Sequence, residues 1–277
     1  MSQKSILITG CSTGIGYDAA KTLHARGWRV FATCRQEKDC KRLRDEGLES
    51  FKLDLASVPS IKKAAAEALK RTGGTLDALF NNGAFATPSF VQDLPIEALR
   101  ETFDVNFFGQ FELIRALMPA FEAQGYGRIV NNSSVLGFAA MRARGAYNAS
   151  KFAMEGLTDT MRLELRGQPI DIILIEPGPI TTAIRQNAQK QFEKWIDWEN
   201  SPRRKIYEKT LIPRLYDESG KLAPGELPPS AVTDKLIHAL ESRRPKPRYY
   251  VTRPTYVAGL IIRLLPTRAR DWFLAKA

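Results

Sequence analysis

The sequence is poor in the residues that bind metals and form disulfides. It has three cysteines, Cys11, Cys34 and Cys40, and two histidines, His24 and His238. The cysteines are odd in number and lie at no metal-ligand spacing, which argues against both a disulfide framework and a zinc site. We therefore expect a reduced, cytoplasmic protein that holds no metal ion.

Long hydrophobic runs and internal repeats are also missing. No stretch approaches the roughly 20 apolar residues that a membrane-spanning helix needs. The short apolar run at residues 5–8 leads directly into glycine, unlike a signal peptide. Of the 277 residues, 44% are hydrophobic and 26% are charged. This composition is typical of a globular protein with a sizeable core, and we expect a single domain over residues 1–277.

Basic charge is concentrated in the C-terminal part of the chain. The net charge is +11. Residues 1–199 carry 25 Lys/Arg and 23 Asp/Glu, whereas residues 200–277 carry 16 and 7. This asymmetry indicates an anionic partner or serves solubility, and the sequence leaves both open. We expect no nucleic-acid partner, because no recognised binding motif accompanies the charge.

Short apolar runs alternate with helical patterns along most of the chain. We predict strands within residues 5–10, 28–34, 49–55, 76–82, 127–134 and 170–178. We predict helices at residues 16–27, 58–73, 96–125, 146–167 and 231–242. Continuous apolar strands that alternate with helices indicate a parallel sheet covered on both faces. The predicted fold class is therefore α/β, a single doubly wound sheet of the Rossmann type.

Two segments depart from this alternation. Residues 185–230 are polar and rich in proline and charge, which is typical of a functional lid or a disordered segment. Within it, Phe192, Trp195 and Ile196 share one helical face, as expected of either a core or a substrate lid. Residues 249–277 form a basic amphipathic extension, which suits a cover over the pocket, a contact with another subunit or peripheral contact with a membrane.

A glycine-rich turn follows the first predicted strand in ILITGCSTGIG, residues 6–16. Gly10, Gly14 and Gly16 let the backbone approach a pyrophosphate, and the next helix offers free N–H groups and the positive end of its dipole. Because the turn stands between a strand and a helix, a dinucleotide site is a better interpretation than a tight turn without a ligand.

Several motifs together resemble those of the short-chain dehydrogenases/reductases over residues 4–185. They are the TGxxxGIG turn of Thr9–Gly16, Asn81-Asn82-Gly83-Ala84, a serine at 134, Tyr147-x-x-x-Lys151 and Pro177-Gly178. The chain looks most similar to the retinol- and hydroxysteroid-dehydrogenase-like branch and to bacterial aldehyde reductases. The family's usual order at the fourth strand is Asn-Asn-Ala-Gly, so the swap here is expected to alter local backbone freedom while leaving the turn usable.

The resemblance implies a set of residues that contact a nicotinamide cofactor. Residues 177–182 should pass beside the nicotinamide, with the Ile180 backbone and the hydroxyl of Thr182, or of Thr181, in contact; a simple turn is the alternative. The other implied contacts are Gly10, Ser12, Thr13, Gly14, Ile15, Gly16, Asn82, Gly83, Tyr147, Lys151, Pro177 and Gly178.

Tyr147 and Lys151 are expected to share one helical face, because residues four apart are neighbours on a helix. A free tyrosine has a pKa of about 10, and a nearby ammonium lowers it towards the range of a useful acid/base. Tyr147 is thus the candidate proton donor to a carbonyl oxygen. A neighbouring hydroxyl would bond that oxygen; Ser133 and Ser134 both qualify by position, and the family spacing favours Ser134. By resemblance, Asn106 organises a proton path, although a structural amide is the alternative.

Arg35 bears on the choice of cofactor. An NAD enzyme typically has an acidic residue about 20 residues beyond the glycine turn. Here Arg35 stands at the end of the second predicted strand, and a guanidinium suits a 2′-phosphate. We therefore predict NADP(H). Asp54 resembles the family's adenine contact, with a capping role as the alternative.

The combined pattern predicts an NADP(H)-dependent oxidoreductase that interconverts a hydrophobic aldehyde or ketone and its alcohol. A redox-sensing protein that binds NADP(H) with little catalysis is the alternative. The family resemblance also implies a homo-oligomer.

Overall fold

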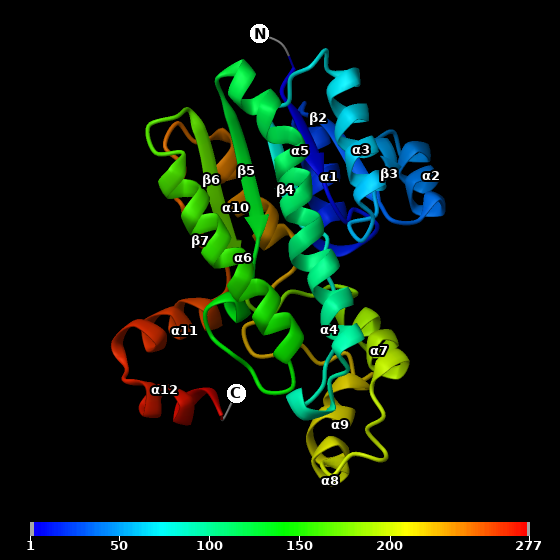
Figure 1. Ribbon diagram of the computed structural model, residues 1–277, viewed down its shortest axis with the longest axis vertical. Coiled ribbons are helices and arrows are strands. Elements are labelled where there is room, and N and C mark those ends of the chain that lie inside the picture. The colour runs from blue at the N-terminus through cyan, green and yellow to red at the C-terminus, as the bar shows by residue number, and fades with distance from the viewer. Residues whose placement is uncertain (1–2, 276–277) are drawn as a thin grey trace.

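Seven parallel strands form one sheet in the computed structural model, which describes residues 3–275. Their order across the sheet is β3-β2-β1-β4-β5-β6-β7 (Figure 1). The strands are β1 (Ser5–Ile8), β2 (Arg29–Cys34), β3 (Glu49–Lys52), β4 (Ala78–Asn81), β5 (Gly127–Asn132), β6 (Ile170–Glu176) and β7 (Arg248–Tyr250).

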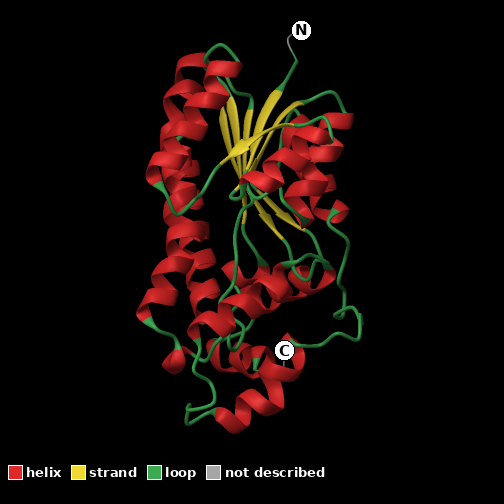
Figure 2. Ribbon diagram, turned by 90° about the vertical axis from the view of Figure 1, so that its right-hand side faces the viewer, coloured by secondary structure: helices red, strands yellow, loops and turns green. Residues whose placement is uncertain are grey.

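Helices cover both faces of the sheet, which confirms the predicted fold class. Because side chains alternate along a strand, Ile6 and Ile8 of β1 pack into the core on one face, whereas Leu7 packs into the core on the other. Figure 2 shows the strands between two layers of helices, with helices and loops alone below the sheet. The first face is covered by α1 (Gly14–Ala25) and α10 (Ser230–Glu241), and the second by α3 (Val58–Arg71), α5 (Gly109–Gln124) and α6 (Gly145–Glu164).

The strand order reverses between β1 and β4. The chain starts in the middle of the sheet, moves outward to β3, and returns to pair β4 with β1, with Ile8 opposite Phe80. The loops that follow β1 and β4 therefore diverge at the same edge. Ligands of open α/β sheets bind at such a switch point, beyond the carboxyl ends of the strands.

The structure adds elements that the sequence patterns did not predict. All six predicted strands are present, and β7 is a seventh. A short helix, α2 (Glu37–Asp45), lies between β2 and β3. The predicted helix at 96–125 is divided, because a π-helical turn at Asp104–Phe108 separates α4 (Ile96–Phe103) from α5.

Residues 185–230 are largely helical and have a small core of their own. Phe192, Ile196 and Tyr207 are buried in it. The Tyr207 hydroxyl donates to Asp93 (3.0 Å) and accepts from the Phe90 N–H (3.0 Å), so the segment is fastened to the loop after β4. A role as a substrate lid stays a prediction. The helices here are α7 (Ile184–Trp195), α8 (Arg204–Ile206) and α9 (Ile212–Leu215), with a π-helical turn at Tyr207–Leu211.

Strand β7 ties α6 to β6 through one arginine. The Arg248 guanidinium pairs with Glu176 of β6 (2.6 Å), with Asp159 of α6 (2.6 Å) and with Glu155 of α6. The Glu176 side chain is fully buried, and burial, with Glu155 nearby, raises its pKa to about 8. Burial works against the charge of Arg248, but its carboxylate partners hold its pKa above the usual range.

Replacing Arg248 should destabilise the fold strongly. Arg248→Ala leaves the buried carboxyl groups of Glu155 and Glu176 without their hydrogen-bonding partner, and leaving a buried polar group unpaired costs about 1–3 kcal/mol. Urea unfolding followed by circular dichroism measures the change in the free energy of unfolding. Arg26→Ala is the matched control, because the Arg26–Glu241 pair (2.6 Å) is largely exposed and should contribute far less. Equal losses in the two variants would contradict the assignment.

Candidate active site

The glycine turn after β1 is closed against the loop after β4. Gly10 (φ +72°) and Gly14 (φ +60°) have left-handed backbones that favour glycine. A Cβ on Gly10 would lie 2.7 Å from the Cα of Gly83, and one on Gly16 would overlap the carbonyl oxygen of Gly10. The turn therefore needs glycine at these positions both for its shape and for close backbone approach.

The start of α1 is open to an anion. Thr13 stands at the N-cap, its side chain makes no cap hydrogen bond, and the first turn holds no acidic residue. The first N–H groups of a helix lack partners within the helix and carry partial positive charge. Ser12, Thr13 and Ile15 thus lie where the sequence predicted a phosphate contact, and their roles stay predictions.

A chain of hydrogen bonds joins this turn to the lysine of α6. The Thr9 hydroxyl accepts from the N–H groups of Asn82 and Gly83 (2.9 Å each). The Asn82 side chain donates to the carbonyl of Thr9 (3.0 Å) and accepts from the Asn132 amide (3.0 Å). Lys151 Nζ then donates to the carbonyl of Asn132 (2.7 Å). The sequence patterns missed Thr9 and Asn132, although both stand where a strand ends.

The swapped Gly83-Ala84 pair leaves the backbone ordinary. Gly83 does not have a positive φ. Among the non-glycine residues of 3–275, Ala143 alone has one, so Ala84 does not either. The swap therefore does not place a glycine where a left-handed conformation requires one. A Cβ on Gly83 would meet the end of the Leu55 side chain at 3.1 Å, which a small shift of that side chain relieves.

Tyr147 and Ser134 face each other in the buried part of the site. Ser134 is the second residue after β5. Its Oγ accepts the Leu136 N–H (3.1 Å) and lies close enough to Tyr147 to influence the pKa of the phenol. Ser133 points elsewhere, since a Cβ on Gly137 would lie 2.6 Å from its Oγ. Of the two predicted alternatives, the structure places Ser134 beside Tyr147.

Burial sets the protonation of Tyr147 and Lys151. Burial raises the pKa of Tyr147 to about 12, with the Ser134 hydroxyl acting in the opposite direction. Burial lowers the pKa of Lys151 to about 8, opposed by the negative charge of Glu155. Burial therefore prevails over the charge of Lys151, and the expected fall in the pKa of Tyr147 is not seen in this structure. The Lys151 ammonium lies 5.6 Å from the tyrosine ring centre, and it donates to Asn132.

Asn106 braces two parts of the site. It lies in the π-helical turn, is fully buried, and its amide bonds both the carbonyl and the N–H of Phe85 (2.8 and 3.1 Å). It also donates to the hydroxyl of Ser150 in α6 (3.2 Å). These bonds fit the structural alternative for its side chain. The role in a proton path stays a prediction, and π-helical turns do occur often at functional sites.

The end of β2 presents a free cation near the glycine turn. Arg35 is exposed and forms no ion pair with any residue in the described part of the chain. Arg42 of α2 supplies a second guanidinium. The sequence patterns predicted neither this helix nor this residue. The Arg42 guanidinium donates to the carbonyl of Ser12 (2.6 Å). Asp54 accepts the N–H of Ala56 (3.0 Å), as in the capping alternative, and its adenine contact stays a prediction.

The loop after β6 lies against the glycine turn. A Cβ on Gly14 would approach Thr182 Cγ2 at 3.0 Å, whereas the Thr181 hydroxyl donates to Glu226 (2.8 Å). Of the two predicted threonines, Thr182 is the one beside the turn. Ile180 forms a single bridge with Leu227, and Pro177 accepts the N–H of Val135 (2.7 Å).

Arg144 adds positive charge at the start of α6. It stands three residues before Tyr147, and burial lowers its pKa to about 10, with Arg214 and Arg185 contributing in the same direction. The sequence patterns gave no sign of this residue, because the segment before the helix carries no motif.

Comparison with known proteins identifies the family. The family model for short chain dehydrogenases matches residues 4–193. The uncharacterised oxidoreductase YbbO of Escherichia coli K12 is 38% identical over 272 residues, which cover 98% of this chain and 94% of that protein. Human 17-beta-hydroxysteroid dehydrogenase type 6 is 30% identical over 285 residues, with 100% and 89% covered.

A solved structure shares the fold along the whole chain. It is a short chain dehydrogenase/reductase from Burkholderia phymatum in complex with NAD, with a TM-score of 0.78, 26% identity, and coverage of 99% of this chain and 95% of that one. The resemblance to hydroxysteroid dehydrogenases is confirmed, and the chain belongs to the short-chain dehydrogenases/reductases, a family of oxidoreductases.

Proposed function

We propose that the protein uses NADP(H) to interconvert an apolar aldehyde or ketone and its alcohol, with Tyr147 as the general acid and base. The observation that carries this proposal is the buried group of Ser134, Tyr147 and Lys151, which is hydrogen-bonded through Asn132 and Asn82 to the glycine turn. A protein that only bound a nucleotide would not need a buried phenol and ammonium beside that turn.

The residues around the glycine turn fit a dinucleotide. Glycine at positions 10, 14 and 16 lets the turn pack tightly against its neighbours, and the start of α1 has no capping side chain, so its N–H groups remain for a phosphate. When bound, the nicotinamide supplies or accepts the hydride. The residues of this chain then have two tasks, which are to hold the reacting carbonyl and to move one proton.

Tyr147 supplies the proton that the carbonyl oxygen needs. With a pKa of about 12, its phenol keeps the proton at neutral pH and can donate it to a carbonyl oxygen that gains negative charge. In this proposal the Ser134 hydroxyl donates a second hydrogen bond to the same oxygen. Lys151, with a pKa of about 8, still carries its charge at pH 7 and stabilises the phenolate that remains.

The proposed substrate is apolar with a polar or anionic end. The apolar side chains of α7, the helix that follows the loop after β6, pack with Phe90 of the loop after β4. Human 17-beta-hydroxysteroid dehydrogenase type 6 is named for a steroid substrate. Arg144 brings a half-buried positive charge to the start of α6, which would suit a substrate that also carries an anionic group.

Loss of the phenol should abolish turnover while leaving the fold intact. Tyr147→Phe should lower kcat by about 100-fold to 10,000-fold, the usual contribution of a positioned general acid. The absorbance of NADPH with a panel of aldehydes and ketones measures the rate, and fluorescence titration measures nucleotide binding. Tyr126→Phe, at an exposed tyrosine before β5, is the control and should keep full activity. Nucleotide binding without hydride transfer in the unaltered protein would favour the sensor alternative and refute this proposal.

Arg35 should determine the preference for NADPH. Arg35→Ala removes a charged hydrogen bond to a 2′-phosphate, so the KM for NADPH should rise by about 10-fold to 100-fold while the KM for NADH stays the same. Steady-state kinetics with both nucleotides tests this. Arg166→Ala, at an exposed arginine after α6, is the control. Equal or better turnover with NADH in the unaltered protein would overturn the cofactor assignment, since NAD is the nucleotide in the B. phymatum relative.

A further inference from the structure

The last two helices are barely anchored in the protein. Helix α11 (Arg253–Leu264) buries only Thr255 and Gly259, and α12 (Thr267–Leu274) buries no residue. In Figure 1 both helices lie beyond the ends of β5 and β6, at the opposite end from the N-terminus. Ile261 and Ile262 are half-buried and Tyr256 packs on Tyr250, but most of the other large side chains of the two helices are exposed to solvent.

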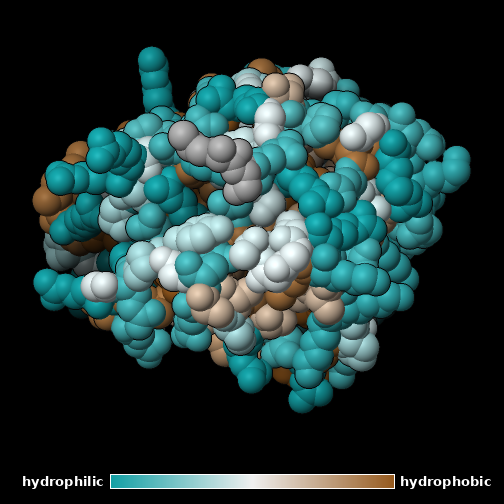
Figure 3. All heavy atoms as spheres, turned by 90° about the horizontal axis from the view of Figure 1, so that it is seen from above, coloured by the Kyte–Doolittle hydropathy of each residue, from teal (hydrophilic) through white to brown (hydrophobic). Residues whose placement is uncertain are grey.

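Much of what they expose is apolar or aromatic. On α11, residues 256, 260 and 264 recur every four positions and so share one stripe, which lies beside the buried Thr255 and Gly259. The Leu264 side chain is 69% exposed. We call the following set the α11–α12 surface: Tyr256, Val257, Leu260, Leu264, Trp272 and Phe273. The face seen from above in Figure 3, around the N-terminus, is by contrast mostly hydrophilic.

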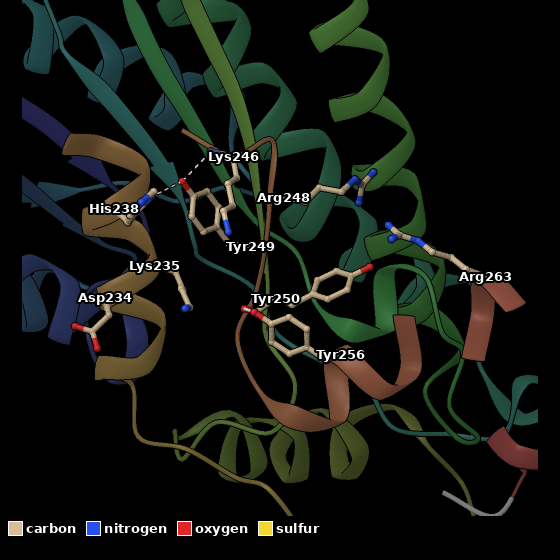
Figure 4. A pocket seen from close by; sticks show the side chains of 9 residues that line it. All are labelled: Asp234, Lys235, His238, Lys246, Arg248, Tyr249, Tyr250, Tyr256 and Arg263. Atoms are coloured by element: carbon tan, nitrogen blue, oxygen red, sulfur yellow. Dashed lines mark hydrogen bonds between the residues drawn. The ribbon is translucent and has the colours of Figure 1, made fainter. Parts of the chain in front are cut away.

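The same helices are basic. They carry Arg253, Arg263, Arg268 and Arg270 against one acid, Asp271. A cavity of about 410 Å³ between α10, β7 and α11 extends this charge. Figure 4 shows Lys235, Lys246, Arg248 and Arg263 around it. The lining residues are Asp234, Lys235, His238, Lys246, Arg248, Tyr249, Tyr250, Tyr256 and Arg263.

We propose that the α11–α12 surface binds an anionic lipid bilayer, with both helices lying in the plane of the interface. Exposed apolar residues would enter the acyl boundary, aromatic rings would sit at the headgroup level, and arginines would reach up to lipid phosphates. None of the helices within residues 3–275 has the length and hydropathy of a membrane span.

A second copy of the chain fits this surface poorly. In a two-fold dimer the same patch faces itself. The four arginines of one copy would then meet those of the other, and like charges across an interface oppose binding. An acidic protein would have the right charge, but the neighbouring cavity, lined by charged side chains, His238 and three tyrosines, is not a purely apolar pocket for an anchoring side chain.

The surface is also connected to the active site. A Cβ on Gly178 would overlap the hydroxyl of Thr252, at the start of α11, and the Tyr250 ring stacks on Phe138 at 5.4 Å between centres. Gly178 and Phe138 lie in the loops that follow β6 and β5. A bound bilayer would therefore stand next to these loops, and under the proposed function an apolar substrate could enter from it.

Flotation of the full-length protein with vesicles tests the binding. The protein should float with vesicles of phosphatidylcholine and phosphatidylglycerol at low salt, and it should stay at the bottom with phosphatidylcholine alone or at high salt. Leu264→Asp should lower the partition coefficient about tenfold or more. Arg268→Ser should lower it about fivefold, the effect of one basic residue at an anionic surface.

Leu163→Asp is the matched control, since Leu163 on α6 is 74% exposed and lies outside the surface. It should float like the unaltered protein, and both aspartate variants should reduce a water-soluble carbonyl at the original rate. Leu260→Ser replaces Leu264→Asp if circular dichroism shows that variant to be unfolded. Failure to float with anionic vesicles at low salt, equal losses in the Leu264 and Leu163 variants, or a dimer that Leu264→Asp dissociates in place of vesicle binding would each overturn the proposal.

Discussion

The hydrogen bond from Lys151 to the carbonyl of Asn132 is the interaction on which the arrangement of the site depends. A buried ammonium is costly unless it is hydrogen-bonded, so this bond fixes α6 against the end of β5. The Asn132 side chain donates to Asn82, and the Asn82 side chain donates to the carbonyl of Thr9 in the loop after β1, so these segments are held together. Three loops from three strands are thereby held at one edge, and the glycine turn and Tyr147 keep a fixed relation.

The same burial also decides which way the proton is ready to move. If the tyrosine and the lysine were exposed, water would screen their charges, and the pKa of each would stay close to its ordinary value. In the closed site, burial raises the pKa of the Tyr147 phenol and lowers that of the Lys151 ammonium. At neutral pH this leaves a protonated donor beside a cation. The resting site is therefore prepared for proton donation, which is the step that carbonyl reduction requires.

Much of the fold could be predicted from the sequence, because strongly periodic hydrophobic patterns predict helices and strands reliably. The six longer strands and the pairing of Tyr147 with Lys151 follow from apolar runs and helical spacing. Strand β7 was missed because it has three residues in a basic stretch, and it is held by the ion pairs of Arg248 more than by apolar packing. Helix α2 was missed because most of its residues are charged, and Arg42 was missed with it.

Other features depend on contacts between distant parts of the chain. A hydrophobic pattern of period 3.6 does not predict the π-helical turn at Asn106. This turn is stabilised by hydrogen bonds from Asn106 to Phe85 and Ser150, which lie outside the helix. Residues 185–230 read as irregular because their core is completed by Phe90, almost a hundred residues earlier. Likewise, no local pattern could show that burial would outweigh the charge of Lys151 at Tyr147.

The C-terminal helices expose a larger share of their apolar side chains than the other long helices do. Elsewhere most apolar side chains lie under other elements, as in the two cores on either side of the sheet, although single ones such as Leu163 are exposed. Helix α11 is held at its first turn, where Thr252 meets Gly178, and then leaves the body with its apolar stripe outward. Leaving several large apolar groups in water lowers solubility and gains nothing in stability. Such a surface is understandable when the environment that covers it is not water, and the arginines among these residues indicate that this environment is anionic.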